Sequence, residues 1–108
     1  MNIIKDYRMI GIYEEALINN IVTTEDGDYV SILEWIQQKI DTDRELTIDI
    51  AYMKKILGPE FGKKNDDAFR VSVRRILKKY DIFLKSKLQD NGSVKMTMRS
   101  YYENSNKR

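Results

Sequence analysis

The sequence predicts an α+β fold that is mainly helical and ends in a β-hairpin. Apolar residues recur at spacings of three and four over most of the chain, and this period changes to two after residue 80. An Asn-Gly pair divides the alternating region into two runs. The chain has 108 residues, 42% of them apolar, which fits one domain with a single core.

The first predicted helix covers residues 5–22. Apolar side chains share one of its faces at helical spacing, namely Tyr7, Ile10, Tyr13, Leu17 and Ile21. The run Thr23–Asp28 then reads as a turn, in which Gly27 is free to take a positive φ.

A capping box predicts the second helix. Ser31 and Glu34 have the spacing in which each side chain satisfies a free amide at a helix start, so we expect a helix over Ser31–Ile40. A polar connection follows at Asp41–Glu45, and Leu46–Ile48 predicts a very short strand.

Thr47 is a candidate N-cap for a third helix over Thr47–Leu57. Its predicted inner face consists of Ile50, Met53, Ile56 and Leu57. Gly58 and Pro59 are expected to end this helix, since glycine tolerates left-handed backbone and proline cannot continue a helix.

The strongest helical pattern covers residues 66–79, after a loop at Glu60–Lys64. Asn65 is the expected N-cap, and Asp66 and Asp67 complement the positive end of the helix dipole. One face carries the apolar residues Phe69, Val73, Ile76, Leu77 and Tyr80.

Two alternating runs then predict a hairpin over residues 82–99. Asn91 and Gly92 between them are expected to supply the positive φ angles of a tight turn. The segment after residue 101 is polar, and we expect a flexible tail over 102–108.

Composition excludes several classes of function. The chain has no Cys and no His, which removes thiolate nucleophiles, Ser-His pairs and the commonest metal ligands. The acidic run Asp41–Glu45 lacks the glycine that a calcium loop needs. We therefore expect no enzyme activity, no cofactor and no metal. No apolar run has the length of a membrane span and no signal peptide precedes the first helix, so we expect a cytoplasmic protein with no membrane partner.

Charge is distributed unevenly along the chain. Residues 1–60 carry 6 Lys and Arg against 12 Asp and Glu, whereas residues 61–108 carry 13 against 5. A basic half of this kind predicts a polyanionic partner, with nucleic acid as the default. The alternative is that the two halves pair with each other or serve solubility.

The order of elements from Ser31 resembles the winged helix-turn-helix superfamily of DNA-binding domains over residues 30–100. It also resembles the small transcriptional regulators of bacteria, archaea and their plasmids or viruses. The resemblance implies a winged-helix domain over 29–101, with a three-helix core plus a C-terminal hairpin wing. Residues 1–28 are then an extra N-terminal helix and loop, which pack on the domain or dimerise.

Within this resemblance, Ser31–Ile40 is similar to the supporting helix and Thr47–Leu57 to the first helix of the helix-turn-helix. Residues 66–79 are similar to the recognition helix, and residues 82–99 to the wing. One departure is the link Gly58–Asn65, because its eight residues exceed the usual three or four.

The candidate DNA-binding residues come from the basic half. On a helical wheel, Arg74, Arg75 and Lys78 lie opposite the apolar face of helix 66–79, and Arg70 and Lys79 flank it. Guanidinium groups bind guanine edges and lysines bind phosphates, so we expect Arg70 and Arg74 on bases and Lys78 and Lys79 on phosphates. Further expected contacts are Lys63, Lys64, Lys85, Lys87, Lys95 and Arg99.

Each of these cations also has a structural interpretation. Lysines at a helix C-terminus complement the dipole, and lysines on an edge strand discourage aggregation. Weighing both interpretations, we expect a protein that binds double-stranded DNA and regulates transcription by occupying a promoter in the nucleoid, without a small-molecule effector. We further expect a homodimer through residues 5–22. The alternatives are a winged-helix module that binds another protein and, less favoured, an RNA-binding adaptor.

Overall fold

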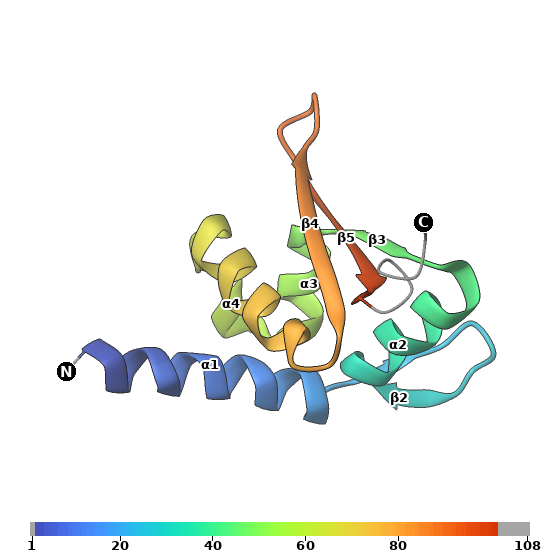
Figure 1. Cartoon of the computed structure of the whole chain (residues 1–108), viewed down its shortest axis with the longest axis horizontal. Helices are drawn as coiled ribbons and strands as arrows, with labels where there is room; N and C mark the ends of the chain where they lie inside the picture. Colours follow the sequence, from blue (N-terminus) through green and yellow to red (C-terminus); the bar gives the residue numbers. More distant parts are fainter. Residues whose placement is uncertain (1, 102–108) are drawn as a thin grey trace.

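The fold is α+β, about half helical, with two small antiparallel sheets (Figure 1). The computed structural model describes residues 2–101, and the side chains of residues 11–101. The helices are α1 (Asn2–Asn19), α2 (Ile32–Asp43), α3 (Ile50–Leu57), the 3-10 helix η1 (Pro59–Phe61) and α4 (Asp66–Lys78). The strands are β1 (Ile21–Thr23), β2 (Tyr29–Ser31), β3 (Leu46–Asp49), β4 (Ile82–Leu88) and β5 (Val94–Ser100).

The larger sheet has the strand order β3-β5-β4, so the last strand in the chain lies in the middle. Leu46 pairs with Met98, which in turn pairs with Leu84 across the sheet. These three side chains are buried on the inner face, which packs against the helices. The alternate residues of β4 and β5 therefore lie on the outer face. The predicted short strand and hairpin are both confirmed.

Three aromatic rings join the N-terminal helix to the rest of the core. Tyr13 of α1 packs against Phe61 of η1 with 4.6 Å between ring centroids, and against Phe69 of α4 at 5.6 Å. All three side chains are buried, and Leu17 is buried with them. The α1 helix thus shares one hydrophobic core with residues 29–101. The predicted tail over 102–108 lies outside the described residues.

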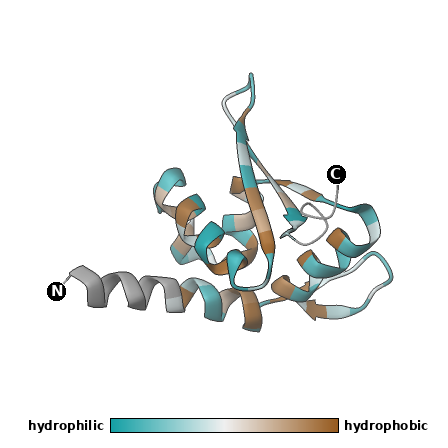
Figure 2. Ribbon diagram, viewed as in Figure 1, coloured by the Kyte–Doolittle hydropathy of each residue, from teal (hydrophilic) through white to brown (hydrophobic). Residues whose placement is uncertain are grey.

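The hydropathy of the residues agrees with the position of this core. Figure 2 shows hydrophobic residues on the parts of α3, α4 and β4 that face the interior, whereas the far end of the hairpin is hydrophilic. The hairpin turn extends toward the top of the view in Figure 1, and Gly92 and Ser93 at the turn line a hollow together with residues of α3.

Two predicted caps are confirmed. The Ser31 Oγ accepts a hydrogen bond from the Glu34 amide at 3.1 Å, at the start of α2. The Asn65 side chain accepts from the amides of Asp67 and Ala68 at the start of α4. In each case one side-chain oxygen satisfies amides that have no partner within the helix.

The predicted cap of the third helix is wrong. Thr47 lies inside β3, where its hydroxyl bonds to that of Thr97 at 2.9 Å. The helix begins three residues later, after Asp49, whose side chain makes no capping bond. The extended backbone of β3 therefore continues further than the sequence suggested, because pairing with β5 holds it in the sheet.

Three other boundaries differ from prediction. The first helix ends at Asn19 and not at residue 22, because Ile21–Thr23 pairs with Tyr29–Ser31. The second helix continues through Asp43 and ends where Arg44 takes a left-handed φ of 73°. The connection Asp41–Glu45 is thus mostly the last turn of α2. The basic helix ends at Lys78, one residue early.

The loop of the hairpin is longer than the tight Asn-Gly turn that the sequence predicted. Gly92 has a φ of 87°, but Asn91 does not have a positive φ. The Gly92 amide donates to the Gln89 carbonyl, and the Asn91 side chain accepts from the amide and hydroxyl of Ser93. Asn91 therefore stabilises the loop through its side chain, with the backbone geometry of a hairpin loop closed by a glycine.

The link between α3 and α4 contains a buried anchor. Gly58 ends α3 with a φ of 142°, and Pro59 then begins η1, so the predicted loop Glu60–Lys64 is helical in part. Phe61 closes this turn and is 1% exposed. A link of eight residues is thus fixed at its centre by an aromatic side chain.

We predict that Phe61→Ala lowers the free energy of unfolding by about 3–5 kcal/mol, because it leaves a cavity against Tyr13 and Phe69. Urea unfolding followed by circular dichroism measures this change. Tyr29→Ala is the control, since Tyr29 is 78% exposed and its loss should cost well under 1 kcal/mol. Equal losses in the two variants would contradict the central position of Phe61.

Candidate nucleic-acid interface

Helix α4 presents three cations to solvent, as the helical wheel predicted. Arg74, Arg75 and Lys78 are exposed, while the opposite face of the helix is buried. We call these three residues the helix cations. Within residues 11–101, no acidic side chain forms an ion pair with any of them. Among the described side chains, the charge of these three residues is therefore uncompensated.

The two acidic residues that begin α4 are neutralised. The Asp66 carboxylate binds the Lys54 ammonium at 2.5 Å, and the Asp67 carboxylate binds the Arg70 guanidinium at 3.0 Å. Carboxylates near a phosphate backbone repel it when they are unpaired. Here each one is compensated by a neighbouring cation, so the first turn of α4 carries no unpaired carboxylate.

Arg70 is half-buried between α4 and the hairpin. Its Nη1 donates to the Ser86 Oγ of β4 at 2.7 Å, while its Nη2 binds Asp67. The side chain thus links the helix to the strand. A guanidinium has five N–H donors, and two are used by these partners.

Lys79 is held by the N-terminal helix. Its ammonium contacts both carboxylate oxygens of Glu14, at 3.0 and 3.2 Å. The Tyr80 hydroxyl donates to the same carboxylate at 2.7 Å. This cluster holds α1 against the end of α4. Lys78 and Lys79 are the two phosphate contacts expected at the C-terminal end of α4. Of these two lysines, only Lys78 is one of the helix cations.

The cations of the hairpin lie on the outer face of the sheet. Lys85 and Lys87 are exposed and have no ion pair within the part of the chain that the structure describes. The ammonium of Lys95 lies 3.3 Å from the Asp49 Oδ1, and the Arg99 Nε and Nη2 both bind Glu45, at 3.1 and 3.0 Å. The hairpin therefore offers two free cations and two that are already paired.

The remaining predicted cations lie in the link before α4. Lys63 is exposed, and Lys64 is half-buried. The Lys64 carbonyl accepts a hydrogen bond from the Lys54 ammonium at 2.6 Å, so its backbone is fixed. Both ammonium groups are without an acidic partner among the described side chains.

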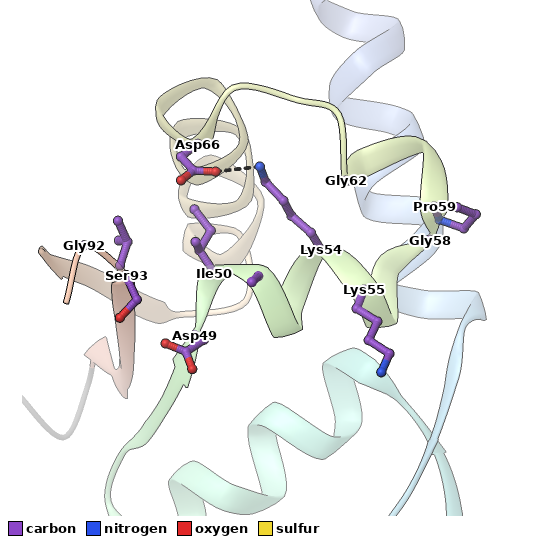
Figure 3. Close-up of a pocket in the computed structure, with 12 residues that line it drawn as sticks. Asp49, Ile50, Lys54, Lys55, Gly58, Pro59, Gly62, Asp66, Gly92 and Ser93 are labelled. Carbon is purple, nitrogen blue, oxygen red and sulfur yellow. Dashed lines mark hydrogen bonds and ion pairs between the residues drawn. The ribbon is translucent and has the colours of Figure 1, made fainter. Parts of the chain in front are cut away.

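Lys54 is a buried cation that the sequence did not single out. It projects from α3 between the apolar positions of the helix, and its side chain is 10% exposed (Figure 3). Asp66 and the Lys64 carbonyl accept from its ammonium, which also lies 5.7 Å from the centre of the Phe69 ring. The available signal was a lysine at the spacing of buried residues Ile50 and Leu57, which indicates a paired charge.

A hollow of about 360 Å³ lies beside this pair, between α3, the link and the hairpin turn. In Figure 3 the Lys54 side chain reaches toward Asp66, whereas Asp49 and Ser93 lie at the opposite side of the hollow. Because the Lys54 charge is already satisfied, this hollow has no free buried cation with which to hold a ligand.

Other classes of site find no support in the described residues. Residues 11–101 contain no group of three acidic side chains placed to hold a metal ion. Among the described helices, none is long and apolar enough to cross a bilayer.

We predict a loss of stability in acid that depends on Glu14. The hydrogen bond from Tyr80 and the contact with Lys79 hold the Glu14 pKa below its usual value of 4.5. A lowered pKa in the folded state contributes stability above the unfolded pKa, and this contribution is lost as pH falls through the folded pKa. The same bond raises the Tyr80 pKa above its usual 10.0, so on the alkaline side stability is lost as pH rises through that folded pKa.

The measurement compares wild type with Glu14→Gln in urea at pH values from 3 to 7. Wild type should be the more stable at pH 7, and the difference should shrink as Glu14 becomes protonated. The control Glu15→Gln removes a neighbouring exposed carboxylate and should leave the pH profile unchanged. A difference that stays constant down to pH 3 would contradict the assignment.

A scan against protein-family models, a search of curated proteins and a search of solved structures each find no match to this chain.

Proposed function

We propose that this chain is a winged-helix domain that binds double-stranded DNA and acts as a small transcriptional regulator. The order α2-β3-α3-α4-β4-β5 supports the proposal, as does the sheet order in which β5 lies between β3 and β4. In this interpretation α4 is the recognition helix and the hairpin β4–β5 is the wing. The chain would act in the cytoplasm, at the nucleoid.

The observation that carries the proposal is the state of the helix cations. Arg74, Arg75 and Lys78 lie on the exposed face of a helix, and no acidic group among residues 11–101 neutralises them. The major groove is wide enough for an α-helix, and arginine can donate two hydrogen bonds to a guanine edge. A helix with this face matches both the shape and the charge of the groove.

The hairpin adds a second point of contact. Lys85 and Lys87 are free cations on β4, and Arg70 ties this strand to α4 through Ser86. Contacts with phosphates fix the register of a protein on the duplex without reading its sequence. We therefore assign base contacts to α4 and backbone contacts to the hairpin, with promoter occupancy as the mechanism.

The test is fluorescence anisotropy with a labelled duplex over a series of salt concentrations. Arg74→Gln/Arg75→Gln should weaken binding at least about tenfold, because it removes two charged side chains that we assign to base edges in the major groove. Both side chains are exposed, so the melting temperature should change little.

The matched control is Thr23→Glu/Gln37→Glu, which causes the same change in net charge at exposed positions outside α4 and the hairpin. This control should bind within about twofold of wild type. An equal loss in both double variants would show that net charge, and not the α4 face, governs binding. If wild-type protein does not bind duplex DNA at low salt, the proposal is contradicted and the protein-binding module is favoured.

We also propose a homodimer formed through residues 5–22. Tyr13 and Leu17 are buried in the protomer's own core, but Ile12 and Ile18 on the same helix are each 45% exposed. Light scattering at tens of micromolar should give twice the monomer mass of 12.8 kDa. Ile12→Glu/Ile18→Glu should give the monomer mass with the same fold. A monomer mass for wild type would refute the dimer.

A further inference from the structure

The outer face of the β4–β5 hairpin is hollowed. The hollow has a volume of about 600 Å³, within the range of small-ligand sites. We call it the outer hollow. It is lined by Glu45, Phe83, Lys85, Ser86, Lys87, Thr97 and Arg99. Most of these residues come from β4 and β5, so the sheet itself positions them.

An aromatic ring forms part of its wall. Phe83 points to the outer face, because its neighbours Ile82 and Leu84 are buried on the inner face. The Tyr101 ring packs against it with 5.7 Å between centroids. Tyr101 thus fixes the orientation of Phe83 from outside the hollow and leaves Phe83 half-buried in its lining.

Two free cations follow the ring along the same strand. Phe83, Lys85 and Lys87 alternate onto the outer face, each about 7 Å from the next, because a strand rises about 3.3–3.4 Å per residue. The ammonium groups of both lysines lack an acidic partner within residues 11–101. Such a row offers an apolar face followed by two positive charges.

The acidic residue in the lining does not cancel these charges. Glu45 Oε1 accepts a hydrogen bond from the Arg99 Nε and lies 3.0 Å from the Arg99 Nη2, so its charge is paired within the wall. The hydroxyl of Thr97 is bonded to that of Thr47, and Ser86 is bonded to Arg70. Within the described residues, the lining groups without a hydrogen bond or ion pair are therefore the Phe83 ring, which packs against Tyr101, and the ammonium groups of Lys85 and Lys87.

We propose that the outer hollow binds an unpaired nucleotide of a nucleic-acid strand. Its base stacks on Phe83, and its phosphates are bound by Lys85 and Lys87. An aromatic side chain with nearby cations is the combination that holds single strands without strong sequence preference. A paired base within a duplex is covered by its neighbours on both faces, so the ring reaches only an unpaired base.

This inference extends the proposed function and rests on it for the class of partner, a nucleic acid. It assigns the hairpin a second role besides contact with the duplex backbone. The helix cations serve the duplex, whereas the outer hollow takes a strand that is frayed or open beside it. The two roles share Lys85 and Lys87, but only the duplex uses the helix cations and only the single strand uses Phe83. Variants of Arg74 and Arg75 and variants of Phe83 therefore test the two roles separately.

The experiment measures the anisotropy of labelled eight-nucleotide DNA and RNA single strands and of a blunt duplex. Wild type should bind single strands, and the DNA and RNA arms identify which of the two the site takes. Phe83→Leu keeps an apolar side chain without a stacking face, and it should weaken single-strand binding about tenfold. Duplex affinity should stay within about twofold.

A conservative variant separates stacking from simple packing. Phe83→Trp retains a ring, so it should bind single strands at least as well as wild type. If the role of Phe83 were merely structural, the Phe83→Trp and Phe83→Leu variants would bind single strands with similar affinities. Should Phe83→Leu fail to fold in thermal melting, Lys85→Gln/Lys87→Gln provides the second variant. It should lower the salt slope on single strands by about 0.7 for each phosphate that the variant no longer binds.

Lys55→Gln is the matched control, because Lys55 is an exposed lysine on α3 away from the outer hollow. It should leave the affinity for single strands unchanged. Wild type that binds duplex but no single strand would overturn this inference and leave the proposed function intact. Loss of duplex binding alone in Arg74→Gln/Arg75→Gln, with single-strand binding kept, would support two separate sites. Single-strand affinity unaffected by Phe83→Leu would overturn the stacking role.

Discussion

The packing of Tyr13, Phe61 and Phe69 is the constraint on which the rest of the structure depends. The three rings come from α1, η1 and α4, of which α1 is distant in the sequence from the other two, and they pack together in the core. Because Phe69 lies in the first half of α4, its packing fixes how that helix is rotated. The rotation in turn decides that Arg74 and Arg75 face solvent. Aromatic packing in the core thus decides which side chains of α4 lie at the surface.

In the folded protein, the carboxylates of the acidic half pair with some cations of the basic half and leave others unpaired. Three acidic residues of the first half pair with cations of the second, since Glu14 binds Lys79, Asp49 binds Lys95 and Glu45 binds Arg99. The alternative that the two halves neutralise each other therefore holds for these cations. It does not hold for the helix cations within the described residues. Within the described part of the basic half, the cations without an acidic partner therefore lie on α4, the link and β4.

Local signals in the sequence predicted local structure well. Asn65 lies immediately before its helix, and a hairpin needs only alternation and a turn, so both followed from neighbouring residues. The position of Thr47 depended on pairing with β5, about fifty residues away, and the helical pattern there favoured the wrong cap. Lys54 was missed for the same reason, because its partner Asp66 lies on another helix. The exposed face of α4 was predictable from periodicity, but which of its cations are paired depended on tertiary contacts.

The link between α3 and α4 has a consequence for the thermodynamics of recognition. Phe61 anchors it in the core, and the Lys54 ammonium holds its end through the Lys64 carbonyl and Asp66. Ordering a free backbone costs about 1–2 kcal/mol per residue, and a flexible connection of this length would impose that cost on each binding event. In this protein the link is already ordered in the folded state, so the entropy cost of ordering it is part of the free energy of folding. The two helices thus form one preorganised body, and in the proposed complex with DNA the eight-residue link would add no ordering cost.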